Sequence, residues 1–211
     1  MSGGAKGEGR GATGGDDGAG ARAAEEDAAL MGRVRLGDEA AFTALMERWE
    51  LPVKRLIARI VLNAGEAEEL AQETMVRVWQ RRGTFRDGAA VRPWIFTIAA
   101  NLARNRLRWW RRRPGVSLQE WSETNDEGRM TNAEGAGGLE RAERAAAVRE
   151  AVAALPVELR EALILFEYEE LGQAEIAMVL GCSVKAVESR VARAREKLRA
   201  ALRVWGAGAQ A

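Results

Sequence analysis

The sequence has no histidine and only one cysteine, Cys182, in 211 residues. The lack of histidine excludes Ser-His and Cys-His nucleophile systems and every histidine-ligated metal site. A single cysteine excludes an intramolecular disulfide and a cysteine-rich zinc site. No apolar run approaches the roughly 20 residues that a membrane-spanning helix needs, and no apolar stretch near the N-terminus indicates a secretory signal. We therefore expect a cytoplasmic protein that is not inserted in a membrane and that belongs to none of these enzyme classes.

The net charge of +1, from 32 basic and 31 acidic residues, conceals an uneven distribution of charge. Residues 28–113 carry 17 basic and 9 acidic groups, whereas residues 1–27 carry 3 and 6 and residues 114–140 carry 1 and 6. Residues 141–211 are nearly neutral, with 11 basic and 10 acidic groups. A basic body between acidic segments indicates a polyanionic partner. The alternative is a solvated helical surface without such a partner.

The composition divides the chain into two helical blocks. Residues 1–27 hold nine glycines in the first twenty positions and no large aliphatic residue beyond Met1, which predicts a disordered tail. The glycine-containing, acidic segment 114–140 predicts a flexible linker. The blocks at 28–113 and 141–205 show helical periodicity and no strand alternation, and 206–211 forms a short tail. We expect an all-α protein of two independently folding domains, because the linker has too little apolar content to join their cores.

Residues 173–198 have the layout of a helix-turn-helix. A short helix at 173–180 is followed by Gly181, which permits a tight turn, and by Ser183, which suits the N-cap of a helix at 184–203. In a helix-turn-helix the second helix enters the major groove of DNA. The alternative is an αα-corner with a solvated basic face, but 7 basic against 2 acidic groups in 182–203 argue against it. The candidate duplex contacts are Ser183, Lys185, Glu188, Ser189, Arg190, Arg193 and Lys197.

Residues 92–113 form an arginine-rich segment with seven arginines and no acidic residue. Helical spacing places Thr97, Asn101, Arg104 and Arg108 on one face, opposite an apolar stripe. Aromatic residues such as Trp94 interleave with the arginines, a combination that suits single-stranded nucleic acid because bases stack on aromatic rings. The alternative is that the aromatic residues belong to the core.

Residues 65–79 predict a helix with an acidic ridge formed by Glu66, Glu69 and Glu73. A ridge of this kind does not face DNA, and it indicates a docking surface for a basic protein. The alternative is that these acids complement the positive N-terminal end of the helix dipole.

Four motifs together resemble a bacterial RNA polymerase sigma factor of the extracytoplasmic-function (ECF) group. They are DEAAF at 38–42, EAEELAQET at 66–74, RPWIFTIAANLA at 92–103 and the long stretch from ALPVELR to REKLR at 154–199. The resemblance covers 31–113 and 141–203 in the order that the family has. It departs from the family pattern at Asn105, where aspartate is frequent, and at Glu188, where a basic residue is frequent.

The resemblance implies that 28–113 is a sigma region-two domain and 141–205 a sigma region-four domain. The first would dock on core RNA polymerase through its acidic helix, and the second would read the minus-thirty-five element as duplex. The loop at 83–91 would capture a flipped base of the minus-ten element. An anti-sigma factor that clamps both domains is a further implied partner, whereas catalysis, metal and cofactor are not implied. The implied docking residues are Glu66, Glu69, Gln72 and Glu73, and the implied single-strand contacts are Phe85, Arg86, Trp94, Asn101, Arg104 and Arg108.

Two other function classes compete with this interpretation. A conventional helix-turn-helix regulator would bind duplex DNA without polymerase, but it leaves the arginine-aromatic segment and the acidic ridge unexplained. A purely structural helical adaptor leaves the basic faces unexplained. Glu188 is open between two roles: a carboxylate near the start of the recognition helix can accept a hydrogen bond from cytosine, or it can pair with Arg195 or Arg199 and never meet a base.

Overall fold

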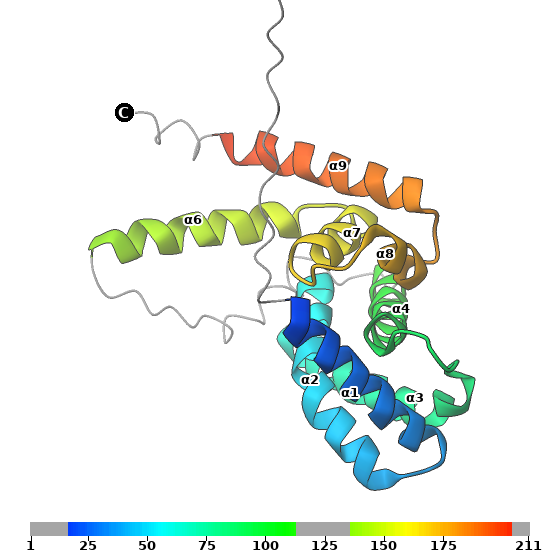
Figure 1. The fold of residues 1–211 in the computed structure, drawn as a ribbon. Helices are drawn as coiled ribbons and strands as arrows, with labels where there is room; N and C mark the ends of the chain where they lie inside the picture. Colours follow the sequence, from blue (N-terminus) through cyan, green and yellow to red (C-terminus); the bar gives the residue numbers. More distant parts are fainter. Residues whose placement is uncertain (1–16, 113–135, 204–211) are drawn as a thin grey trace, which may run out of the picture.

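The computed structural model describes residues 17–112 and 136–203, and all regular structure in these ranges is helical (Figure 1). The all-α class predicted from the sequence is therefore confirmed for the described part of the chain. None of the helices in these ranges is long and apolar enough to cross a membrane. The elements are α1 (Asp17–Arg35), α2 (Glu39–Val61), α3 (Ala64–Arg81), the 3-10 helix η1 (Arg82–Thr84), α4 (Val91–Arg111), α6 (Ala136–Ala153), α7 (Val157–Glu167), α8 (Gln173–Leu180) and α9 (Val184–Ala201).

Helix α2 is the central element of the first domain. It contacts α1, α3 and α4, and eight of its residues are buried. The Asp38 carboxylate accepts a hydrogen bond from the backbone N–H of Ala41 at 2.9 Å, which satisfies one of the free donors of the first turn. Pro52 lies inside the helix, and α2 nevertheless continues to Val61.

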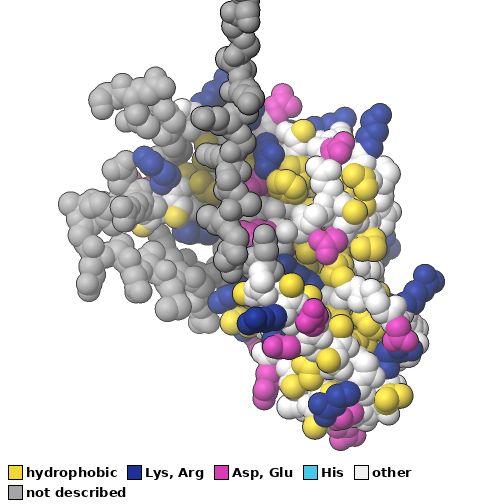
Figure 2. All heavy atoms as spheres, in the orientation of Figure 1, with side chains coloured by type: hydrophobic (Ala, Val, Ile, Leu, Met, Phe, Trp, Pro, Cys, Tyr) yellow, Lys and Arg dark blue, Asp and Glu magenta, His cyan; other side chains and the backbone are white. Residues whose placement is uncertain are grey.

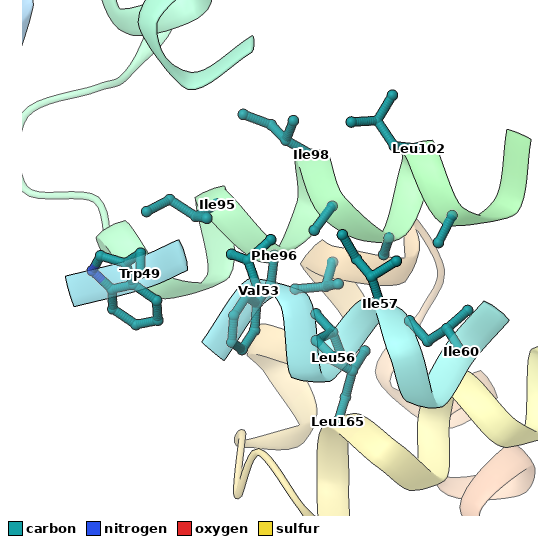
Figure 3. Packing of buried hydrophobic residues seen from close by; sticks show 14 of the residues in the cluster. Trp49, Val53, Leu56, Ile57, Ile60, Ile95, Phe96, Ile98, Leu102 and Leu165 are labelled. Carbon is teal, nitrogen blue, oxygen red and sulfur yellow. The ribbon is translucent and has the colours of Figure 1, made fainter. Parts of the chain in front are cut away.

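Packing between α2 and α4 forms the middle of the core (Figure 3). Trp49 of α2 meets Phe96 of α4 edge to face, with ring centroids 5.7 Å apart. Pro93 lies in the first turn of α4, where its missing N–H removes no helical hydrogen bond. This contact fixes the direction of α4 and hence the placement of its arginines.

The N-terminal tail ends earlier than the sequence analysis predicted. Residues 17–27 belong to α1 rather than to a disordered segment, and Asp27 is buried. Arg48 of α2 donates to Asp27 at 3.2 Å and also pairs with Glu26. The prediction of disorder for 17–27 is thus wrong, because α1 packs on α2 and two of its carboxylates pair with Arg48. Residues 1–16 and 204–211 lie outside the described residues.

The second domain consists of α6 to α9, with α7 packed against both α8 and α9. Gly181 has φ +63 and joins α8 to α9 in the left-handed conformation that the predicted turn requires. The bounds of α8 agree with the prediction, whereas α6 begins at Ala136, ahead of the predicted 141. The predicted linker therefore extends into α6, and its part at 114–135 lies outside the described residues.

The two domains share one cluster of buried residues instead of having the separate cores we expected. Helix α7 packs on α2 and α8 packs on α4. Leu165 of α7 is fully buried and lies beside Leu56 of α2 (Figure 3). The interface arises because α7 is apolar on two sides, so that one side faces α9 and the other faces the first domain.

We expect Leu165→Ala to lower the free energy of unfolding by about 2–5 kcal/mol, since it removes a fully buried side chain at this junction. Urea unfolding followed by circular dichroism measures the change. Leu51→Ala, at a leucine that is 50% exposed, is the matched control and is expected to stay within about 0.5 kcal/mol of wild type. Equal effects of the two substitutions would contradict the interface.

Candidate nucleic-acid interface

Helix α9 presents a polar, largely basic face to solvent. The Ser183 hydroxyl accepts a hydrogen bond from the backbone N–H of Ala186 at 3.2 Å, so the predicted N-cap is present. Val187, Val191 and Ala194 are buried and hold the helix on the domain. Arg190 is half-buried, and its guanidinium lies 3.7 Å from the sulfur of Cys182. The exposed members of the predicted duplex-contact set are Ser183, Lys185, Glu188, Ser189, Arg193 and Lys197.

Glu188 is exposed near the start of α9. Of its two predicted intrahelical partners, Arg195 is engaged elsewhere: it pairs with Glu167 of α7 at 2.6 Å and lies over the Phe166 ring at 5.0 Å. This removes one of the two pairings that compete with a base contact. A hydrogen bond from Glu188 to a base stays a prediction.

The arginine face of α4 is exposed only in part. Asn101 and Arg108 are exposed, but Arg104 is half-buried. Together with Thr97 they line one wall of a cleft of about 390 Å³. The opposite wall belongs to the second domain and includes Glu158, Glu161 and the C-terminal end of α8 from Met178 to Gly181.

Arg104 is bound by the second domain through three groups. Its guanidinium donates to the carbonyl oxygens of Leu180 at 3.3 Å and Val179 at 3.4 Å, which are the free acceptors at the end of α8. Its Nε lies 3.7 Å from a carboxylate oxygen of Glu161. A further hydrogen bond of 2.6 Å goes to Asn101 on its own helix. The sequence predicted the face of the helix on which Arg104 lies, but it did not predict that the second domain would supply its partners.

Glu161 is the most unusual titratable group of this site. It is 1% exposed, and burial raises the pKa of its carboxyl to about 7, while Arg104 opposes the shift. The neighbouring Arg160 is buried as well, and its pKa falls to about 10 because desolvation disfavours the charged form. An ionised carboxylate at position 161 lowers the stability of the folded state unless Arg104 stays beside it.

The aromatic residues of the predicted single-strand set divide into two kinds. Phe85 is 4% exposed and packs edge-on against Trp94, with centroids 5.3 Å apart. In this conformation the Phe85 ring is a core residue, and nothing in its placement supports the predicted base contact. Trp94 is half-buried, and Arg86 is exposed in the loop that follows η1. The sequence could not separate these cases, because a loop position shows no periodicity that reveals burial.

The acidic ridge on α3 is partly neutralised by α4. Glu66 pairs with Arg106, and Glu69 approaches the same guanidinium at 3.5 Å. Glu73 pairs with Arg77 one turn along α3 at 2.7 Å. The outer edge of the ridge holds Gln72 and also Val76, whose side chain is 54% exposed and which the sequence analysis missed. The sequence did contain a signal for the exposure of Val76, because this apolar residue lies outside the apolar stripe of the helix. Figure 2 shows such isolated apolar side chains between charged ones on the side of the molecule that it presents.

Within the described ranges no group of histidine, cysteine, aspartate and glutamate side chains is arranged to hold a metal ion. The candidate site consists of three surfaces: two are cationic, on α4 and α9, and one is mixed acidic and apolar, on α3. Such surfaces bind polymers by charge and shape.

Comparison with protein families and curated proteins gives consistent similarities. Residues 45–113 match the family model for sigma-70 region 2, and residues 145–198 match that for sigma-70 region 4. The RNA polymerase sigma-H factor of Pseudomonas aeruginosa is 36% identical over 84% of this chain and 94% of its own length. The ECF RNA polymerase sigma-E factor of Escherichia coli K12 is 32% identical over 82% of this chain and 92% of its own.

Solved structures give the same picture. The structure of CnrH in complex with the cytosolic domain of CnrY has a TM-score of 0.62 and 26% identity, and the match covers 85% of this chain and 98% of that one. The sigma factor RpoE of Bartonella quintana, solved with the anti-sigma factor NepR, has a TM-score of 0.59 and 23% identity over 77% and 97%. At that identity the second likeness is one of fold.

The raised pKa of Glu161 predicts a pH dependence of stability. The usual value is 4.5 and the folded value about 7, so between these values the folded state holds a proton that the unfolded state releases. The free energy of unfolding should therefore fall as pH rises from about 4.5 to about 7, by up to about 3 kcal/mol. Glu161→Gln should remove this slope in urea unfolding curves recorded across that range. Glu167→Gln, near the end of the same helix, controls for the loss of one carboxylate, and an unchanged slope in Glu161→Gln would contradict the assignment.

Proposed function

The chain belongs to the ECF group of RNA polymerase sigma factors, and we propose on this premise that its three surfaces divide the work of promoter recognition. It is a sigma subunit of bacterial RNA polymerase, with core polymerase and promoter DNA as its partners. The observation that carries this division is that the chain has two separate cationic surfaces. One is the N-capped recognition helix α9, and the other is the arginine face of α4. A regulator that binds duplex DNA alone needs only the first.

Helix α9 is proposed to read the minus-thirty-five element in the major groove. Its exposed residues Lys185, Ser189 and Arg193 suit phosphate and base-edge contacts, and their cationic members supply affinity that depends on salt. The half-buried Arg190 is held at the turn by its contact with Cys182. Glu188 is then available for selectivity rather than affinity, since a carboxylate repels phosphate.

The arginine face of α4 is proposed to hold the opened minus-ten strand. Arg104 and Arg108 would follow the phosphates, while Asn101 offers both donor and acceptor groups to a base edge. Trp94 is half-buried and presents part of its ring for stacking, and Arg86 is exposed in the loop that follows η1. For Phe85 to meet a base, its ring would first have to leave the contact with Trp94, so we assign it the role of supporting Trp94.

The surface on α3 is proposed to dock on core polymerase. Glu69, Gln72 and Glu73 lie along one edge with the exposed Val76, which gives an apolar contact within a polar rim. Glu66 is tied to Arg106 and serves to orient α3 against α4. The chain on its own would have no catalytic activity and would act in the cytoplasm, where polymerase and promoters meet. CnrH was solved in complex with the cytosolic domain of another protein, CnrY, and we propose an anti-sigma factor as a protein partner of this chain.

Promoter-specific transcription tests this function. The purified chain is mixed with core polymerase and a library of promoter fragments, and transcripts are sequenced. Initiation from a defined subset of promoters is the expected result. Duplex binding in the absence of polymerase, without initiation in its presence, would favour the conventional regulator instead.

Charge reversal on α3 should weaken polymerase binding. We expect Glu69→Lys with Glu73→Lys to lower affinity for core polymerase about tenfold or more, because like charges would meet across the docking surface. Fluorescence titration with labelled core polymerase measures the loss. Glu47→Lys with Glu50→Lys, at exposed acids of α2, is the matched control. If both double variants lose affinity equally, the effect is one of net charge and the docking surface lies elsewhere.

Substitution on the two cationic surfaces should separate strand opening from duplex binding. Arg108→Ala should reduce the permanganate reactivity of unpaired thymines near the start site about tenfold and leave binding of a minus-thirty-five duplex unchanged. Arg193→Ala should weaken that duplex binding and lower its dependence on salt. The reverse pattern would overturn the assignment of the two surfaces.

A further inference from the structure

A second groove lies between α3 and α4, and all of the residues that line it belong to the first domain. Its volume is about 700 Å³, which lies within the range of roughly 300–1,000 Å³ that ligand pockets span. Leu70 of α3 and Leu102 of α4 are buried and form its apolar base. Trp109, near the end of α4, lies at its rim and is 41% exposed. We call this feature the Trp109 groove.

The Trp109 groove carries an excess of positive charge. Its lining includes one carboxylate, that of Glu73, which pairs with Arg77 at 2.7 Å. Arg106 also lines the groove, and the acidic ridge of α3 already neutralises it. Arg108 and Arg112 line it as well, and neither makes an ion pair with a carboxylate in the ranges 17–112 and 136–203. Two guanidinium groups without a counter-charge therefore remain at the rim, and they suit an anionic polymer.

Trp109 gives the groove a flat aromatic surface. Its ring meets that of Trp110 edge to face, with the centroids 5.2 Å apart. Trp110 is half-buried and packs against the core of the first domain, so this contact holds the Trp109 ring in a fixed orientation. An exposed ring beside arginines suits single-stranded nucleic acid, because a base stacks on the ring while the guanidinium groups hold the backbone.

Asn105 explains why the charge of the groove stays positive. The sequence departs from the family pattern at this position, where aspartate is frequent. The side-chain carbonyl oxygen of Asn105 accepts a hydrogen bond of 2.5 Å from the guanidinium of Arg108. The amide therefore orients Arg108 without neutralising it, whereas an aspartate would pair with Arg108 and repel a phosphate. The departure at Asn105 thus favours an anionic ligand in this groove.

The groove continues the arginine face of α4. Arg108 lines both the cleft that contains Asn101 and the Trp109 groove, so it connects the two. Along the helix axis Trp109 lies about 12 Å beyond Asn101, since an α-helix rises about 1.5 Å per residue. A protein partner fits this groove less well, because charged residues are depleted at the centre of protein interfaces and here they surround the apolar base.

We propose that the Trp109 groove is an additional nucleotide subsite, in which a base stacks on Trp109 while Arg108 and Arg112 hold the adjoining phosphates. This rests on the proposed function of the arginine face of α4, and it extends that face toward the end of the helix. Stacking tolerates any base, because every base has a π-face. The subsite therefore adds affinity for the opened strand and little selectivity for its sequence.

Removal of single bases from the DNA tests the subsite. The chain is assembled with core polymerase and titrated into a fluorescent single-stranded oligonucleotide, whose sequence is the non-template strand of a promoter found in the transcription assay. In a series of such oligonucleotides each base in turn is replaced by an abasic sugar, and binding is measured by anisotropy. Wild type is compared with Trp109→Ala and with Trp109→Phe, which keeps an aromatic ring.

We expect one position at which loss of the base weakens binding by wild type and by Trp109→Phe about tenfold. Trp109→Ala should bind the intact oligonucleotide about tenfold more weakly, and the abasic sugar at that position should weaken its binding no further. If Trp109→Ala does not fold, Trp109→Leu replaces it, because leucine keeps an apolar contact with Trp110 but has no π-face. Additive losses at every position overturn the proposal.

The phosphate contact is tested separately with Asn105→Asp. The added carboxylate should pair with Arg108, weaken oligonucleotide binding and reduce the dependence of log affinity on log salt by about 0.7, the value for one phosphate of a single strand. Gln173→Glu makes the same change of charge at an exposed residue of α8 and should leave the salt dependence unchanged. Equal salt dependence of the two variants overturns the assignment of Arg108 to a phosphate in this groove.

Failure of this proposal is distinguishable from failure of the proposed function. Initiation by wild type, together with the absence of any base coupled to Trp109, rejects the subsite alone. Loss of affinity for labelled core polymerase in Trp109→Ala, again without a coupled base, assigns the groove to the polymerase and overturns the proposal. A coupled base in oligonucleotide binding by the chain alone, without promoter-specific initiation, keeps the subsite and rejects the sigma function.

Discussion

The burial of α2 on more than one side is the constraint from which the rest of the arrangement follows. Its apolar residues face α4 through Trp49 and Val53 and face the second domain through Leu56. A helix that is apolar over so wide an arc needs several neighbours to cover it. Helices α1, α3, α4 and α7 are these neighbours, and together they set the angle at which the arginines of α4 and the acids of α3 are presented.

Three of the cationic groups of α4, those of Arg92, Arg104 and Arg106, each have an anionic neighbour inside the molecule. Arg106 turns toward α3 and pairs with Glu66, whereas Arg104 turns toward the second domain and Glu161. Desolvation disfavours both members of such pairs, and burial raises the pKa of Glu161 although Arg104 lies beside it.

The sequence predicted local structure well at residues whose type strongly favours one backbone conformation or one position in a helix. Helix α8 was placed from end to end, because Gly181 favours the tight turn that follows it, and Ser183 was identified as the N-cap of α9 because serine suits that position. The sequence could not predict that Arg104 meets the end of α8, since periodicity reveals which face of a helix is polar but not what lies opposite. The burial of Phe85 could not be predicted on the same ground, because it depends on Trp94, which is nine residues away.

The engagement of Arg104 by several acceptors at once constrains how this position can change in evolution. A lysine offers one compact ammonium group and would serve a phosphate, but it cannot reach two carbonyl oxygens and a carboxylate in separate directions. A neutral residue would leave Glu161 buried without its cation. Two requirements therefore constrain the residue at position 104. It has to bind the acceptors within the chain, and it has to bind the DNA strand that we assign to this face. Substitutions at Arg104 and Glu161 should consequently occur together among descendants of this sequence rather than singly.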